Sequence, residues 1–264
     1  MPRQPSTSFF SATPVFTREQ YAAAVGRSSA DKVVTAMLTH HLGAGNLRRV
    51  ARGVFASVPK HVDPAAWSVD RFLAASRLRE GGVIAYHSAL ELHGYAYTPG
   101  QEVQVIATGE AGLQKTANFT CRFLKSPKGF STAEDVMSLD RLGLAVRVST
   151  LERTIADLFD RPDLSGDAEE LLNSLDLVPR VNADALASHL SGLGNATAIG
   201  AAAWWLEREA ERLGVSAVTL QTLRPFAPKR ARYALGARPG DGRLAKGWNV
   251  ILPFEIVERR FEGL

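Results

Sequence analysis

The 264-residue chain contains a single cysteine, Cys121, and therefore cannot form a disulfide within itself. This excludes the small disulfide-stabilised folds of secreted proteins and is typical of proteins in the reducing cytosol. None of the six histidines stands at a ligand-like spacing from the cysteine or from paired carboxylates. The sequence therefore predicts neither a metal site nor a bound cofactor.

Long hydrophobic runs are also lacking. The longest apolar stretch comprises the 11 residues 196–206, whereas a membrane-spanning helix needs about 20. The first 16 residues carry one arginine and have no apolar core of signal-peptide length. We therefore expect a cytoplasmic protein that has no contact with a membrane.

Sequence motifs of the common hydrolases and nucleases are missing as well. The chain has no GxSxG, HExxH or CxxC motif, no phosphate-binding glycine loop and no Glu-x-Lys pair. Its one Asp-x-Glu, Asp167-Ala168-Glu169, stands at an expected helix start, where acidic side chains interact favourably with the helix dipole. We therefore predict that the protein is not an enzyme, and in particular not a nuclease or a nucleotidyltransferase.

The positive charge is concentrated in the first quarter of the chain. The net charge is +4, but residues 1–62 hold eight Lys/Arg against two acidic residues, and the remainder has a small acidic excess. Such asymmetry favours a polyanionic partner for that segment, although a solvated surface would give the same counts. A second, shorter basic cluster, Lys229-Arg230-Ala231-Arg232, precedes an expected strand at Tyr233.

The arrangement of residues 17–60 decides between these alternatives. Thr17 and Gln20 form a capping-box pattern that starts one helix, which Gly26 ends. A tight turn leads to a second helix, about residues 30–42, whose polar side carries small groups and one lysine. Two strand-forming segments then flank Arg52-Gly53, a plausible hairpin turn.

Helix, turn, helix and basic hairpin follow one another in the order of a winged helix-turn-helix. In that fold the second helix enters the major groove of duplex DNA, and basic residues of the hairpin contact phosphate. The alternative is a winged-helix fold used for protein contacts. The predicted DNA-binding residues are Arg27, Ser28, Ser29, Lys32, Thr35, Thr39, Arg48, Arg49 and Arg52.

We expect an α+β protein in three parts: a flexible arm at 1–16, the winged helix-turn-helix at 17–60, and a larger mixed α/β domain at 63–264. The arm is rich in Ser, Thr and Pro, although its phenylalanines could pack on the module. In the larger domain, Asp63-Pro64 marks the boundary, and a small antiparallel sheet with helices on its faces precedes a helical C-terminal half. The expected strands are residues 102–107, 119–124, 135–139 and 144–148.

A well-marked helix follows the last of these strands. Ser149 and Glu152 form a second capping-box pattern. Leu151, Ile155 and Leu158 recur on one face, so the helix is expected to pack inward. Arg153 and Asp157 would form an exposed i,i+4 pair, and Arg161-Pro162 would end the helix.

Four stretches of the chain, GNLRRVARGVFAS, YHSALELHGY, VSTLERTIADLFDRPDLSGD and LAKGWNVILP, follow one another at characteristic spacings. Together they resemble AbiEi-like antitoxins of type IV toxin–antitoxin systems, which act in phage defence. The resemblance spans about residues 17–254. It implies a winged-helix domain that represses its own operon by binding inverted repeats in promoter DNA. It also implies that residues 63–264 neutralise a nucleotidyltransferase-like toxin without forming a stable complex.

Two other functions are compatible with parts of the sequence. A stand-alone winged-helix regulator with a ligand-sensing or oligomerisation domain would share the N-terminal features. A downstream gene for a nucleotidyltransferase-like toxin would favour the antitoxin. An enzyme would have to show metal-dependent cleavage or nucleotide transfer, and the missing acidic motifs argue against this.

Overall fold

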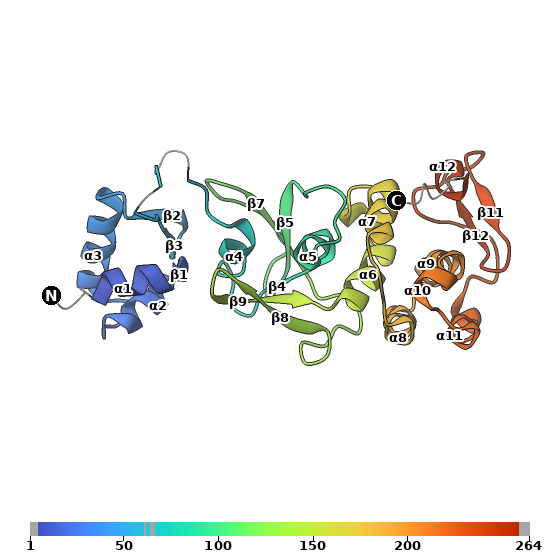
Figure 1. Ribbon diagram of the computed structural model, residues 1–264, viewed down its shortest axis with the longest axis horizontal. Coiled ribbons are helices and arrows are strands. Elements are labelled where there is room, and N and C mark those ends of the chain that lie inside the picture. The colour runs from blue at the N-terminus through green and yellow to red at the C-terminus, as the bar shows by residue number, and fades with distance from the viewer. Residues whose placement is uncertain (1–4, 61, 64–66, 259–264) are drawn as a thin grey trace. The chain divides into compact units, whose positions relative to one another are not determined.

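The computed structural model describes residues 5–60, 62–63 and 67–258 of an α+β protein with several small sheets (Figure 1). Backbone contacts divide the chain into two compact units, each assembled from separate segments. The first unit comprises residues 1–84, 101–125 and 137–148, and the second comprises 85–100, 126–136 and 149–264. No helix in the described part of the chain is long and apolar enough to cross a membrane.

Residues 5–60, here called the N-terminal module, contain three helices and a three-stranded antiparallel sheet of order β1-β3-β2. The hairpin predicted around Arg52-Gly53 is present, because Ala51 pairs with Val54 across that two-residue turn. The elements in chain order are α1 (Pro5–Ala12), β1 (Val15–Thr17), α2 (Arg18–Ala24), α3 (Lys32–Gly43), β2 (Leu47–Ala51) and β3 (Val54–Ser57).

Aromatic residues of the expected flexible arm are part of the module's core. Residues 5–12 form α1, and residues 15 and 16 begin β1, so the expectation of a loose arm is wrong for them. Residues 1–4 lie outside the described residues. Phe16 is fully buried and its ring centroid lies 5.0 Å from that of Phe9. Phe10 stacks on Tyr21 at 5.6 Å. Burial of these rings offsets the entropy lost on ordering the segment.

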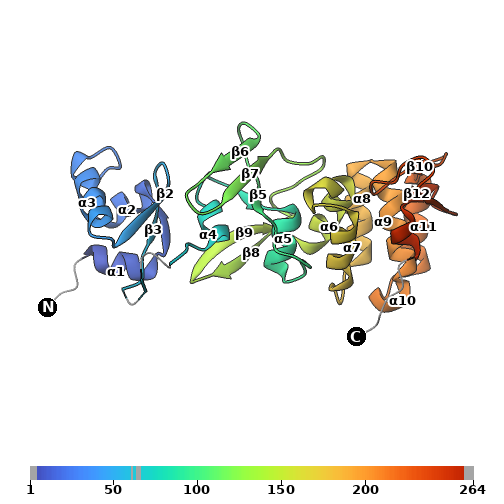
Figure 2. The same cartoon turned by 90° about the horizontal axis from the view of Figure 1, so that it is seen from above.

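A six-stranded sheet of order β6-β7-β5-β4-β9-β8 forms the rest of the first unit (Figure 2). The prediction of antiparallel pairing is wrong for β5 with β7 and for β4 with β9, which are parallel. Strand β6 was not predicted, because its pattern is largely exposed and has no buried alternation. The elements are α4 (Arg71–Ala75), β4 (Val83–Ile84), β5 (Glu102–Ile106), β6 (Gly112–Lys115), β7 (Thr120–Leu124), β8 (Val136–Arg141) and β9 (Leu144–Ser149).

The second unit is mainly helical, as predicted for the C-terminal half. Helix α6 packs against α5, α8 and α9, and α11 packs against α8 and α9. A short sheet of order β10-β12-β11 lies beside α9 (Figure 1). The elements are α5 (Tyr86–His93), α6 (Leu151–Asp160), η1 (Pro162–Leu164), α7 (Ala168–Asp176), α8 (Ala183–Leu193), α9 (Ala196–Arg208), α10 (Ala210–Leu213), α11 (Ala217–Leu223), η2 (Arg224–Phe226), β10 (Arg232–Tyr233), β11 (Arg243–Ala245), β12 (Val250–Leu252) and α12 (Phe254–Glu258).

The start of α6 differs from the capping box predicted at Ser149. The cap residue is Thr150, and its side chain makes no capping hydrogen bond. The Ser149 hydroxyl is buried and lies 2.7 Å from that of Thr154, and the Glu152 carboxylate accepts the N–H of Asn182. The predicted capping box is therefore wrong, because the helix begins one residue later, and Ser149 and Glu152 bond to Thr154 and Asn182 instead.

The Arg153–Asp157 pair was predicted to be exposed, and this is wrong. Both side chains are 1% exposed, and three hydrogen bonds of 2.7–3.0 Å join the guanidinium to the carboxylate. The same guanidinium donates to Asp135 at 3.4 Å and to the Lys128 carbonyl at 3.2 Å. Burial raises the pKa of Asp157 to about 6, although the bonds from Arg153 act in the opposite direction. This network fastens the 128–135 segment to α6.

Gly200 allows α9 to approach the short C-terminal sheet closely. A Cβ at this position would lie 2.7 Å from Val250 Cγ1 and 2.9 Å from the Trp248 carbonyl oxygen. We expect Gly200→Ala to lower the free energy of unfolding by about 1–3 kcal/mol through overpacking. Chemical denaturation measures this. The matched control is Gly192→Ala in α8, where a Cβ meets nothing within 4 Å. A loss in the control equal to that of Gly200→Ala would contradict the close approach.

Candidate nucleic-acid interface

Helix α3 begins at a well-formed cap. The Asp31 carboxylate accepts the N–H of Val33 at 2.8 Å and forms an ion pair with Arg27, also at 2.8 Å. The Val33 N–H and then Arg27 hold the pKa of Asp31 below its usual value. Arg27, one of the predicted DNA contacts, thus has an acidic partner next to the helix N-terminus.

One face of α3 is exposed and polar, as the sequence predicted. Lys32, Thr35 and Thr39 lie on it at helical spacing, while Val34 and Leu38 are buried on the other side. Val33 is also 42% exposed. The exposed face therefore combines one cation with small hydroxyl and aliphatic groups, which leaves room for a partner to approach closely.

Arg18 organises this region and was not among the predicted residues. Its side chain donates to the carbonyl oxygens of Ser29 and Asp31 and, at 2.7 Å, to the Thr35 hydroxyl. Its backbone N–H donates to the Gly53 carbonyl at 2.8 Å. Arg18 thereby ties the start of α3 and the tip of the β2–β3 hairpin to one residue. Arg18 stands in the first turn of α2, where a cation is unfavourable for the helix dipole. In the sequence, this unfavourable position was the one indication that the Arg18 side chain bonds to groups outside its own helix.

The hairpin presents its three arginines differently. Arg52 is exposed in the turn beside Gly53, whose φ of 78° is readily adopted by glycine. Arg49 is also exposed, with its guanidinium carbon 5.8 Å from the Phe55 ring centroid. Arg48 is half-buried and donates to the Trp67 carbonyl at 3.1 Å. Arg49 and Arg52 are therefore the more accessible cations, and Arg48 anchors the segment that follows the module.

The two predicted serines lie in the turn before α3. Ser28 is exposed, and its hydroxyl accepts the N–H of Ala30 at 3.3 Å. The Ser29 carbonyl accepts the Arg18 guanidinium. Of the predicted polar residues of the turn and of α3, Ser29 and Thr35 therefore contact Arg18 directly.

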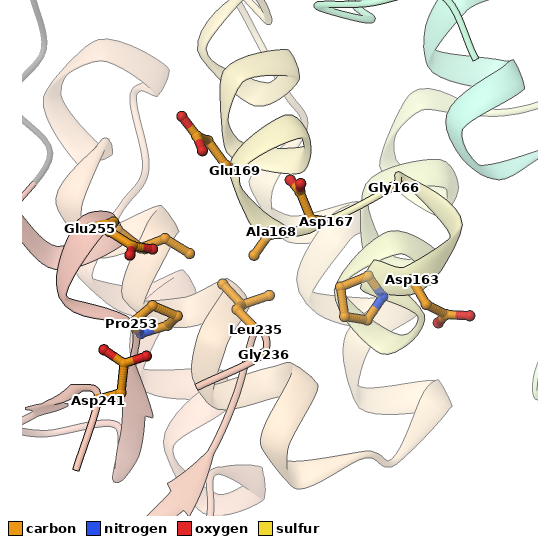
Figure 3. A pocket seen from close by; sticks show the side chains of 12 residues that line it. Asp163, Gly166, Asp167, Ala168, Glu169, Leu235, Gly236, Asp241, Pro253 and Glu255 are labelled. Atoms are coloured by element: carbon orange, nitrogen blue, oxygen red, sulfur yellow. The ribbon is translucent and has the colours of Figure 1, made fainter. Parts of the chain in front are cut away.

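A cleft of about 580 Å³ in the second unit offers carboxylates from α7 and from the C-terminal segment (Figure 3). Asp167 caps α7 by accepting the N–H of Glu170, and Asp163 forms a surface ion pair with Arg161. Two of its acids therefore serve the local fold. Among the described residues no group of three or more His, Cys, Asp and Glu could hold a metal ion.

Comparisons with known proteins identify the fold alone. No family model and no curated protein matches the chain. The crystal structure of the RV2827C protein from Mycobacterium tuberculosis is similar to it, with a TM-score of 0.66 and 17% sequence identity. The match covers 94% of this chain and 90% of that one.

Proposed function

We propose that the N-terminal module is a winged helix-turn-helix that binds duplex DNA, with α3 in the major groove and the β2–β3 hairpin on phosphate. The contacts of Arg18 carry this proposal, because they hold the polar start of α3 and the basic hairpin tip together. A surface of this kind joins a potential reader of base edges to cations that neutralise the DNA backbone.

The Thr35 hydroxyl has a defined polarity in this proposal. It accepts a hydrogen bond from Arg18, so its own proton is directed to another acceptor. In the major groove such acceptors are N7 and O6 of guanine, N7 of adenine and O4 of thymine. Thr35 therefore favours a base pair that presents an acceptor at that position.

We further propose that the protein is an antitoxin that represses its own operon and neutralises a nucleotidyltransferase-like toxin. The resemblance of the four sequence stretches to AbiEi-like antitoxins supports this function. Residues 86–93 and 151–160 of those stretches form α5 and α6, which pack together in the second unit. A stand-alone regulator is the alternative, and the identity of the neighbouring gene separates the two.

Co-expression with the toxin encoded next to the gene tests the antitoxin activity. The full-length chain should restore growth, and the DNA-binding variant Lys32→Ala/Arg49→Ala/Arg52→Ala should restore it equally when expressed from an unrelated promoter. Loss of rescue in this variant at normal protein level would place the activity in operon repression. Failure of the wild-type chain to restore growth would favour the stand-alone regulator.

We expect Arg18→Ala to lower the difference in binding free energy between the preferred and the other bases at one base pair by about 1–3 kcal/mol. The reason is that the Thr35 hydroxyl loses the donor that orients it. Competition binding with operators substituted at each base pair measures this loss. Thr35→Val, which removes the hydroxyl, should relax the same base pair, and the double variant should add little. A uniform loss across all substituted operators would show that Arg18 contributes only charge or stability.

A further inference from the structure

The second basic region of the chain is as highly charged as the first. Residues 224–247 hold seven Lys/Arg and one acidic residue, whereas the remaining residues of 63–264 hold 16 basic and 24 acidic residues. A charge of +6 within 24 residues of an otherwise acidic region indicates a surface for a polyanion.

Two of these seven cations have acidic partners. Arg224 contacts Glu207 at 3.2 Å and lies over the Trp248 ring, and Arg243 contacts Glu258 at 3.0 Å. The other five are exposed and form no ion pair with any described residue; they are Lys229, Arg230, Arg232, Arg238 and Lys246. Cations without partners remain available to bind phosphate.

Exposed apolar side chains accompany these cations. In the β10-β12-β11 sheet, Tyr233 and Leu244 both pair with Ile251, so the three form one row across the sheet. Tyr233 is 47% exposed, and Phe226, just before the basic cluster, is 48% exposed. These large side chains offer ring and aliphatic surface next to the unpaired charges.

A hollow adjoins the same strand. Tyr233 and Arg238 line a cleft of about 550 Å³ together with Asp160 of α6, Asn195, which caps α9, and Thr197 in the first turn of α9. The helix dipole of α9 favours negative charge at its N-terminus, where the Asp160 carboxylate accepts a hydrogen bond from the Asn195 side chain at 2.7 Å. Arg238 therefore adjoins a space large enough for a nucleotide, and the Tyr233 side chain lies on the face of the sheet opposite to Val250, which packs against Gly200 of α9.

We propose that Lys229, Arg230, Arg232, Tyr233 and Arg238, the C-terminal basic surface, bind single-stranded nucleic acid. Unstacked bases pack on Tyr233 and on arginine planes, and the cations follow the phosphates. Duplex DNA offers no free base faces to such a surface. This site is independent of the promoter binding proposed for the N-terminal module.

Fluorescence anisotropy of the full-length chain tests the proposal. The background is Lys32→Ala/Arg49→Ala/Arg52→Ala, which removes binding by the N-terminal module, and the probes are 20-nucleotide single strands of RNA and DNA. We expect binding that weakens with salt and is at least 10-fold tighter than to a duplex of equal length. Arg230→Gln/Arg232→Gln and Tyr233→Leu should each weaken it about 5- to 100-fold. Arg243→Gln, which loses a cation that already has a partner, should have little effect.

Three results would overturn the proposal. One is equal binding to single strands and duplex. Another is a Tyr233→Leu variant that folds normally, by its circular dichroism, and binds as tightly as its parent. The third is a competition in which polyglutamate displaces the labelled strand as effectively as unlabelled strand does at equal total charge. This result would indicate an acidic protein partner instead.

Discussion

Replacing Arg153 with alanine is expected to lower the free energy of unfolding of the second unit by about 3–5 kcal/mol. The side chain is 1% exposed and contacts the carboxylates of Asp157 and Asp135, which are themselves buried. Its removal leaves two carboxylates in a poorly solvated site with their main cation gone. Urea denaturation followed by circular dichroism measures the loss.

Two comparison variants make this prediction specific. Arg161→Ala breaks a pair with Asp163 whose members are 47% and 61% exposed, and should cost no more than about 1 kcal/mol. Arg153→Met/Asp157→Leu removes both charges of the strongest contact and should be less destabilising than Arg153→Ala. If Arg153→Ala is no more destabilising than Arg161→Ala, the buried network does not hold the unit together.

Replacing both accessible hairpin arginines, Arg49→Ala/Arg52→Ala, is expected to weaken binding to all DNA sequences about equally. Each lost phosphate contact should make the salt dependence of log K shallower by about one unit. Binding titrations on the operator and on unrelated duplexes at several salt concentrations measure both effects. Arg48→Ala is the matched control, and a smaller effect is expected because Arg48 donates to the Trp67 carbonyl.

The opposite pattern would reverse the division of roles. If hairpin variants changed sequence preference while Lys32→Ala and Thr35→Ala did not, the hairpin would read bases and α3 would contact the backbone. Thr39 is also exposed on α3, and we expect it to contact base edges together with Lys32 and Thr35.

Local patterns predicted much of the N-terminal module because its signals are short-range. Thr17 and Gln20 form both bonds of the predicted capping box, and the Arg52-Gly53 turn joins the predicted strands. The contact of Arg18 with Thr35 spans 17 positions and has no periodic signature. Docking of Phe9 and Phe10 likewise depends on a core that only the folded chain forms.

In the second unit, the spacing of residues along a helix led to a wrong prediction of exposure. An Arg and an Asp four residues apart are usually solvated on a helix surface, yet the 128–135 segment covers Arg153 and supplies Asp135. A sequence pattern gives the angular position of a side chain on its helix but not what packs over it. The sequence also did not predict the parallel pairing of β5 with β7. The chain between them contains β6, which pairs with β7 at the edge of the sheet, so β5 and β7 run in the same direction.

The salt dependence of binding to the duplex upstream of its own gene distinguishes a DNA-binding winged helix from one that contacts another protein. The full-length protein should bind this DNA more tightly than an unrelated duplex. With about 4–6 phosphate contacts, log K should fall with log salt concentration at a slope of roughly −4 to −5. Absent binding, or binding that does not change between about 50 and 200 mM salt, would contradict a winged-helix DNA-binding module.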